Sequence, residues 1–167
     1  MLMETAALPS ANRFGLIVAA VSAATLGAAF IAQYGFGLQP CELCLWQRWP
    51  YAVAILLGLG AALLPRRRAP LLGLAALSFA IGGGIAIFHV GVEQHWWQGL
   101  ASCSGAPTPN SIEALRTQLM TAPVTRCDEP AFRFLGLTMA GWNVLWSALL
   151  AVTTAFAARR ALARDAA

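Results

Sequence analysis

The sequence contains no lysine, and only 11% of its 167 residues are charged, against roughly 25% in ordinary soluble domains. Because 59% of the residues are hydrophobic, the chain has too little polar surface to cover a soluble core. It also lacks a haem, flavin or nucleotide-binding motif. These absences exclude an ordinary water-soluble enzyme and indicate that lipid is the relevant solvent.

The hydrophobic residues that are present fall into four blocks, each about 20 residues long, and a helix of that length spans a hydrocarbon core of about 30 Å. The expected spans are residues 14–33, 46–64, 71–90 and 135–157. We therefore predict an all-α membrane protein, a four-transmembrane-helix bundle forming a single integral membrane domain over residues 1–167. Its two outer loops are expected at residues 34–45 and 91–134.

The first block has a competing interpretation as a cleavable signal peptide, since Arg13 precedes an apolar run that ends in small residues. That run is longer than the usual 7 to 15 residues of a signal peptide. The length favours a retained helix, and in both interpretations residues 34–44 emerge on the far side of the membrane.

Prolines mark both ends of the second span. Pro50 removes one backbone N–H, so we expect a kink there or a helix whose regular part begins at that residue. The segment Pro65–Pro70 predicts a tight basic turn whose two prolines stop both neighbouring helices. The aromatic belt at the membrane interface is expected to include Trp46, Trp49 and Tyr51.

Two further patterns concern the third span and the loop after it. Gly82-Gly83-Gly84 lets either a neighbouring backbone or a flat ligand approach closely, and close packing is the favoured interpretation. In the second outer loop, Asn110 and Glu113 form a capping box. They predict a short helix, ending near Met120, that lies on the membrane surface.

The arginines predict the topology. An even number of spans places both termini on one side of the membrane, and that side collects seven of the eleven arginines in short segments. These are Arg13, Arg66, Arg67, Arg68, Arg159, Arg160 and Arg164. The positive-inside rule makes this side cytoplasmic. All four cysteines then face outward, which in a bacterial inner membrane is the periplasm, where disulfides persist.

The segment on which the rest depends is Pro40-Cys41-Glu42-Leu43-Cys44, followed four residues later by Arg48. If a helix begins near Cys41, both sulfurs and the guanidinium lie on one face, at positions i, i+3 and i+7. A thiolate at a helix N-terminus is stabilised by the unpaired N–H groups and the helix dipole, and Cys44 is the better placed for this.

Together these features resemble the disulfide bond formation protein B (DsbB) family. The resemblance covers most of the chain: four spans, Cys41 and Cys44 with Arg48 at the start of the second span, and Cys103 and Cys127 in the second outer loop. It implies an inner-membrane, quinone-dependent protein thiol oxidase. The implied electron donor is a DsbA-like periplasmic thioredoxin-fold protein, and the implied acceptor is ubiquinone or menaquinone, with no nucleic-acid partner.

The resemblance also implies roles for individual residues. Cys103 would be attacked by the reduced partner, with Cys127 as its loop mate. Cys41 would exchange with that loop pair, and Cys44 would face the quinone ring. The quinone-site residues would be Arg48, His89 and Cys44.

Several alternatives remain at this point. Cys103 and Cys127 also suit an inert disulfide closing a loop of about 25 residues, worth about 3 kcal/mol. Arg48 also suits an arginine that reaches the headgroups from a helix end. The cysteines suit a non-enzymatic scaffold with structural disulfides or zinc, although Cys103 and Cys127 do not form the second close pair of a zinc site, and we expect no metal. His95 is expected at the interface, and Glu93 is given no role. A family member that serves one dedicated substrate is a further alternative.

Overall fold

The computed structural model of the protein describes residues 10–100, 111–113, 116–117, 126–130 and 132–165. The long helices are α1 (Ser10–Phe30), α3 (Arg48–Leu63), α4 (Arg68–Glu93) and α6 (Met139–Asp165). The shorter elements are the π-helical turn η1 (Ile31–Gly35), α2 (Glu42–Trp46), the 3₁₀ turn η2 (Pro65–Arg67), and the strands β1 (Arg133–Phe134) and β2 (Leu137–Thr138).

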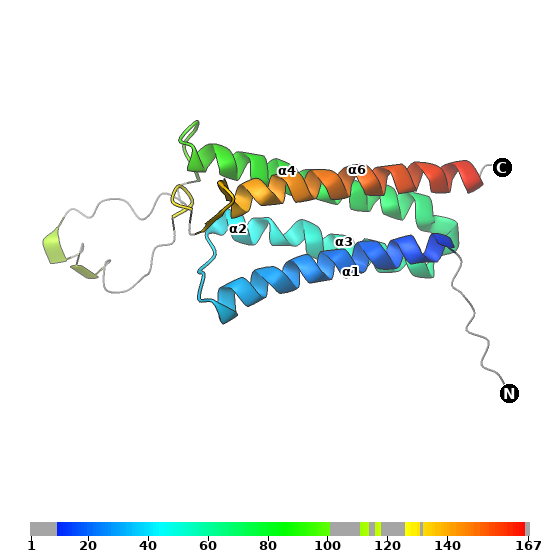
Figure 1. Cartoon of the computed structure of the whole chain (residues 1–167), viewed down its shortest axis with the longest axis horizontal. Helices are drawn as coiled ribbons and strands as arrows, with labels where there is room; N and C mark the ends of the chain where they lie inside the picture. The colour runs from blue at the N-terminus through cyan, green and yellow to red at the C-terminus, as the bar shows by residue number, and fades with distance from the viewer. Residues whose placement is uncertain (1–9, 101–110, 114–115, 118–125, 131, 166–167) are drawn as a thin grey trace.

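The four long helices lie side by side in an elongated bundle (Figure 1). Helix α4 packs along both α6 and α3, and α1 packs along α3, whereas α1 and α6 touch at few places. The start of α1, turn η2 and the end of α6 share one end of the bundle (Figure 1). We call it the arginine end, after Arg13, Arg66–68, Arg159, Arg160 and Arg164. The opposite end carries α2 and is called the sulfur end, after Cys41, Cys44 and Cys127.

Three segments in the described part of the chain are long and apolar enough to cross a membrane: Arg13–Gly35, Pro65–Glu93 and Met139–Arg164. The protein is therefore an all-α, multi-pass membrane protein. Helix α3 has only 16 residues, which at about 1.5 Å each cover about 24 Å, less than a typical hydrocarbon core. The fourth crossing expected from the sequence thus stays a prediction.

The second block is divided in two where a single helix was expected. Helix α2 ends at Trp46, Gln47 forms a turn, and α3 begins at Arg48. Pro50 is the third residue of α3, where a missing N–H leaves no hydrogen bond unmade. The regular helix therefore begins close to this proline, which fits one of the two expected outcomes.

Two expectations, one about a helix boundary and one about an interface residue, need correction. Pro70 does not stop a helix but lies in the first turn of α4, where proline is tolerated. Tyr51 is 3% exposed and packs on Phe79 in the core. Its hydroxyl can be buried there because it donates a hydrogen bond to Asn143 of α6. Trp46 and Trp49, by contrast, are 48% and 71% exposed and available to an interface.

Small residues bring the helices close together. A Cβ atom added at Gly58 of α3 would meet the backbone N of Ala19 and the backbone O of Gly15, both on α1, at 2.8 Å. In α4, Gly82 faces Pro50 and Gly83 faces Ser147, so these two glycines support the close-packing interpretation. A Cβ at Gly84 would meet nothing within 4 Å, because it borders a cavity between Trp46 and Phe88.

The second outer loop contains a feature that the sequence did not reveal. Strands β1 and β2 form a short antiparallel hairpin that pairs Arg133 with Thr138 and Phe134 with Leu137. Because of this hairpin the last helix begins at Met139 and not at residue 135, where it was expected. Of the expected surface helix, residues 112, 113, 116 and 117 are helical and its remaining residues lie outside the described part, as does Cys103.

Candidate functional site

Cys41 is the N-cap of helix α2. Its backbone is extended, and its Sγ accepts a hydrogen bond from the backbone N–H of Cys44 at 3.3 Å. This reverses the expectation that Cys44 is the better placed to gain from unpaired helix N–H groups. The helix begins at Glu42, so the N–H of Cys44 points back at Cys41.

The two sulfurs of this pair are in hydrogen-bonding contact and differ in acidity. Cys41 and Cys44 are free thiols whose Sγ atoms lie 2.9 Å apart. The hydrogen bond with the Cys44 side chain holds the pKa of Cys41 well below its ordinary value, helped by His89 and opposed by burial. The same hydrogen bond and burial raise the pKa of Cys44. Cys41 is therefore the thiolate of the pair, and Cys44 keeps the proton.

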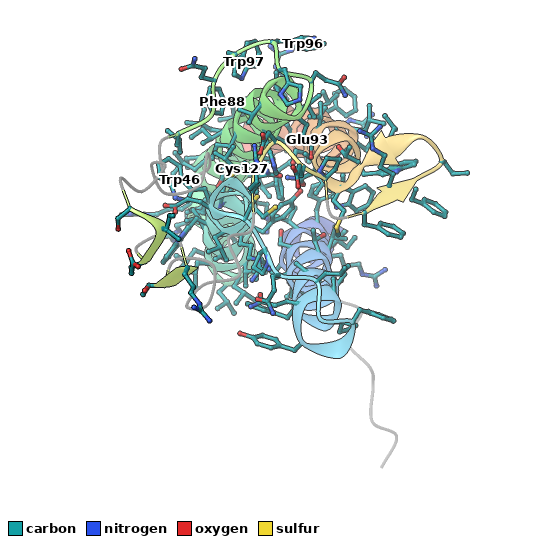
Figure 2. All side chains as sticks on the ribbon, turned by 90° about the vertical axis from the view of Figure 1, so that its left-hand side faces the viewer. Trp46, Phe88, Glu93, Trp96, Trp97 and Cys127 are labelled. Atoms are coloured by element: carbon teal, nitrogen blue, oxygen red, sulfur yellow. The ribbon has the colours of Figure 1, made fainter. Side chains whose placement is uncertain are left out.

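His89 and Glu93 bring two further titratable groups to the sulfurs. They lie one turn apart on α4 and are buried, at 4% and 8% exposed. The Nε2 atom of His89 is 3.6 Å from Cys41 Sγ and 3.8 Å from Glu93 Oε1. Figure 2 shows Glu93 among the helices near Cys127, with Trp96 and Trp97 at the periphery. Glu93, to which the sequence gave no role, thus belongs to the site.

Glu93 is held from the start of α6. The hydroxyl of Thr138 donates to Glu93 Oε2 at 2.6 Å and accepts the backbone N–H of Gly141 at 3.1 Å. The Thr138 side chain therefore caps α6 and orients the carboxylate in one arrangement. This fixes α6 against the sulfur end of α4.

A chain of side-chain hydrogen bonds leads from His89 into the bundle. Gln47 Nε2 lies 2.9 Å from His89 Nδ1, and Asn143 Nδ2 donates to Gln47 Oε1 at 2.5 Å. Tyr51 OH donates to Asn143 Oδ1 at 2.6 Å and lies 2.9 Å from Ser147 Oγ. Sequence reasoning missed these residues. The available signal was the pair of amides, Gln47 and Asn143, inside apolar segments, where polar side chains mark functional sites.

Arg48 joins the site to α1. Its side chain is half-buried, Nη1 donates to Gln33 Oε1 at 2.7 Å, and Cζ lies 5.0 Å from the centroid of the Phe30 ring. These contacts hold the guanidinium beside α1, and Arg48 lines the same cavity as Cys44. A cation is thus fixed at an apolar wall.

The cavity at the sulfur end has a volume of about 420 Å³. This volume falls within the range of small-molecule sites. Its apolar walls come mainly from α1 and α6, two helices that touch at few places. The reactive groups on its lining are Cys41, Cys44, Arg48, His89 and Glu93.

Cys127 is brought to the same place. It is 1% exposed, disulfide-bonded, and packed in a cluster with Cys41, Leu43 and Val92. The structure thus gathers three of the four predicted cysteines at one end of the bundle, and Cys103 lies outside the described residues.

Cys41, Cys44 and His89 have potential metal-binding atoms within 4.8 Å of one another. The side-chain amide of Gln47, however, offers an N–H to His89 Nδ1, which leaves the ring proton on the Nε2 atom that would have to bind the metal. The expectation of no metal stays a prediction, and the hydrogen bonds favour it.

Comparison with known proteins places the chain in a family. The family model described as "Disulfide bond formation protein DsbB" matches residues 11–157. A disulfide bond formation protein B of Xanthomonas euvesicatoria is 36% identical over 151 residues, covering 83% of this chain and 86% of the relative. One of Cupriavidus necator is 31% identical over 150 residues, covering 87% and 91%.

An uncharacterized protein of Rickettsia prowazekii is 29% identical over 140 residues, covering 82% of this chain and 81% of its own length. No solved structure matches the chain. The family match spans the helices, the Cys41–Cys44 segment and Cys127 alike. The chain therefore belongs to the DsbB family of membrane disulfide bond formation proteins.

Proposed function

We propose that this protein is a quinone-dependent thiol oxidase. It reoxidises a DsbA-like periplasmic thioredoxin-fold protein by disulfide exchange and passes the electrons to ubiquinone or menaquinone. The observation that carries the proposal is a pair of free cysteines, Cys41 and Cys44, on the lining of a mostly apolar cavity that is also lined by Arg48.

The residues that line the cavity fit a quinone. Apolar walls suit a flat lipid-soluble ring, and the apolar lining residues of α1 and α6 suit a hydrophobic tail. Arg48 supplies hydrogen bonds and positive charge where negative charge develops on an oxygen. A bound quinone supplies a two-electron acceptor, which the side chains themselves do not provide.

The electron balance closes with these groups. Two thiols lose two electrons and two protons as they form one disulfide, and a quinone gains the same two electrons and two protons to become a quinol. The Glu93 carboxylate is buried 3.8 Å from His89 Nε2, which in turn lies 3.6 Å from Cys41 Sγ. The chain thus offers Glu93 as a proton acceptor close to the sulfurs.

The pair of sulfurs supports a division of roles. The hydrogen bond to the Cys41 thiolate is the largest cause of the raised pKa of Cys44. When Cys41 is held in a mixed disulfide, that cause disappears and Cys44 becomes more acidic. Cys44 then becomes the thiolate at the cavity, the role proposed for the sulfur that faces the quinone, while Cys41 exchanges with the loop pair.

The loop pair faces the protein partner in this proposal. Cys103 is the sulfur attacked by the reduced partner, and Cys127 is its mate. The burial of Cys127 against Cys41 supports a transfer between the two pairs over a short distance. Disulfide exchange needs such an approach of three sulfurs.

The proposed topology places the sulfur end in the periplasm and the arginine end in the cytoplasm of a bacterial inner membrane. The shared position of the start of α1, η2 and the end of α6 supports it, because seven arginines then lie on one side (Figure 1). Reporter fusions at η2 should be active only with cytoplasmic reporters. Activity of a periplasmic reporter there would contradict the assignment.

The decisive experiment mixes the purified protein with a reduced thioredoxin-fold partner, with and without added ubiquinone, in the absence of oxygen. We expect partner oxidation beyond the two disulfides that the two cysteine pairs of each chain can supply only when quinone is present, with one quinol formed per further disulfide. Thiol trapping without quinone should show both cysteine pairs becoming reduced. Cysteine pairs that never change state would support a structural scaffold instead.

A further inference from the structure

The hydrogen bonds behind His89 have a direction, and this direction determines where the imidazole carries its proton. A neutral imidazole has one donor and one acceptor nitrogen, whereas an imidazolium has two donors and needs an acceptor at each. A group at Nδ1 that can only donate therefore favours the neutral form with its proton on Nε2. In this protein that group is the side-chain amide of Gln47, with its Nε2 at 2.9 Å.

The orientation of the Gln47 amide follows from the next residue along. Asn143 Nδ2, which is only a donor, lies 2.5 Å from Gln47 Oε1. Gln47 must therefore use its oxygen toward Asn143 and its Nε2–H toward His89. In this structure Asn143 Oδ1 accepts from Tyr51 OH at 2.6 Å and Ser147 Oγ lies 3.4 Å from the same oxygen, which leaves Asn143 Nδ2 to face Gln47.

The hydrogen bond at Nδ1 determines what the other ring nitrogen of His89, Nε2, carries. With Nδ1 accepting from Gln47, the proton of the neutral ring is on Nε2, which lies 3.6 Å from Cys41 Sγ and 3.8 Å from Glu93 Oε1. Both of these groups accept hydrogen bonds when ionised. The backbone of Cys127 also faces the ring.

We propose that Gln47 and Asn143 are positioning residues that hold His89 in the neutral Nε2–H tautomer, so that this N–H donates to the Cys41 sulfur. They do so against the Cys41 sulfur and the Glu93 carboxylate, whose negative charges favour the imidazolium. The tautomer itself does not depend on the proposed function. Its consequence for disulfide exchange at Cys41 does rest on that function. When a disulfide to Cys41 is broken by an attacking thiolate, the electron pair of the broken bond stays on Cys41 Sγ. The His89 N–H and the Cys44 N–H then stabilise that charge.

The test reads the ring directly by ¹⁵N NMR of histidine-labelled, reduced protein in lipid nanodiscs at neutral pH. The chain has two histidines, so the experiment uses a His95→Asn background. Asparagine suits the positive φ of 58° at that position. We expect Nδ1 to give the signal of an unprotonated nitrogen and Nε2 that of a protonated one. An Nδ1–H tautomer or an imidazolium would overturn the proposal.

Two variants reverse the hydrogen bonds while keeping side-chain size. Gln47→Glu places a carboxylate at Nδ1, and we expect protonation at that nitrogen. Asn143→Asp removes the N–H that Gln47 Oε1 accepts, so the Gln47 amide should turn its oxygen toward His89. The imidazole proton should then lie on Nδ1 in this variant too. The second variant changes no atom in contact with the ring, so a purely packing role for Asn143 would leave the tautomer unchanged and contradict the proposal.

Gln39→Glu is the matched control. Gln39 lines the same cavity with an exposed side chain, so the substitution adds the same charge without a hydrogen bond to His89. We expect the wild-type tautomer in this variant. A shift of the proton there as large as in Gln47→Glu would show that cavity charge alone sets the tautomer. Because the readout needs neither quinone nor partner, it separates failure of this inference from failure of the proposed oxidase activity.

Discussion

At the arginine end of the bundle, α1 and α3 approach so closely that a single added methyl group at Gly58 would meet backbone atoms of α1 at 2.8 Å. At the sulfur end, the same bundle leaves a cavity of about 420 Å³ and buries Gln47, His89 and Glu93. Backbone contact and small apolar residues hold one end, and paired polar side chains hold the other. The difference indicates that the arginine end supports the fold, while the sulfur end gives up apolar packing to place reactive groups.

The largest expected effect comes from removing one sulfur at the cavity. Cys44→Ser should abolish quinone reduction, since serine forms no disulfide, while thiol exchange with a reduced partner at Cys103 continues. Absorbance of the quinol measures the loss of quinone reduction, and trapping of the mixed disulfide measures the continued thiol exchange. Retained quinone reduction in this variant would remove Cys44 from its proposed role.

A titration of the two sulfurs should show a large difference in acidity. The lowered pKa of Cys41 keeps its thiolate as the pH falls through the range where ordinary thiols, with a pKa of about 8.5, take up protons. In reduced Cys103→Ser/Cys127→Ser protein we expect about one thiolate per chain at pH 6, measured by ultraviolet absorbance. That signal should disappear when Cys41 is also replaced by serine, and its persistence would assign the thiolate to Cys44.

The guanidinium should matter for quinone affinity more than for the fold. Arg48→Ala removes a charged hydrogen-bond donor worth about 1.5–3 kcal/mol, so the KM for quinone should rise about 10- to 100-fold. Arg48→Lys keeps the charge but not the planar donor geometry, so its KM for quinone should lie between those of the wild type and Arg48→Ala. An unchanged KM in Arg48→Ala, measured with short-tail ubiquinone, would favour the interpretation of Arg48 as a headgroup contact.

The smallest effect on chemistry should come from the arginine end. Gly58→Ala forces α1 and α3 apart and should lower the free energy of unfolding by about 1–3 kcal/mol, with the Cys41 titration unchanged. Gly27→Ala is the control, because a Cβ there would meet nothing within 4 Å. Thermal unfolding in nanodiscs measures both. Equal stability of the two variants would contradict the packing difference between the ends.

The sequence predicted the features that depend on local patterns. Hydropathy located the long helices, because about 20 apolar residues in lipid must pair their own backbone groups. The three-residue spacing placed Cys41 and Cys44 together, as the 2.9 Å between their sulfurs now shows. What it did not reveal depends on partners far apart in the chain. Tyr51 reads as an interface residue until Asn143, 92 positions later, is known to accept its hydroxyl hydrogen.

Other elements were missed because their sequences contradict the usual preferences. The hairpin of β1 and β2 turns through Leu135 at φ 51° and Gly136 at φ 80°, and a leucine is rarely found with a positive φ. Glu93 falls in the expected outer loop 91–134, and its hydrogen-bond donor, Thr138, falls in the expected span 135–157, so no sequence pattern indicated that the two side chains meet. Such residues become interpretable only when α4 and α6 are seen together.

The central claim is that the sulfur end alone can pass the electrons of a dithiol to a quinone. The most direct measurement uses Cys103→Ser/Cys127→Ser protein with Cys41 and Cys44 fully reduced, mixed without oxygen with ubiquinone and no partner. The account predicts one quinol formed per chain as both thiols disappear. Thiols that remain reduced, with no quinol formed, would contradict it.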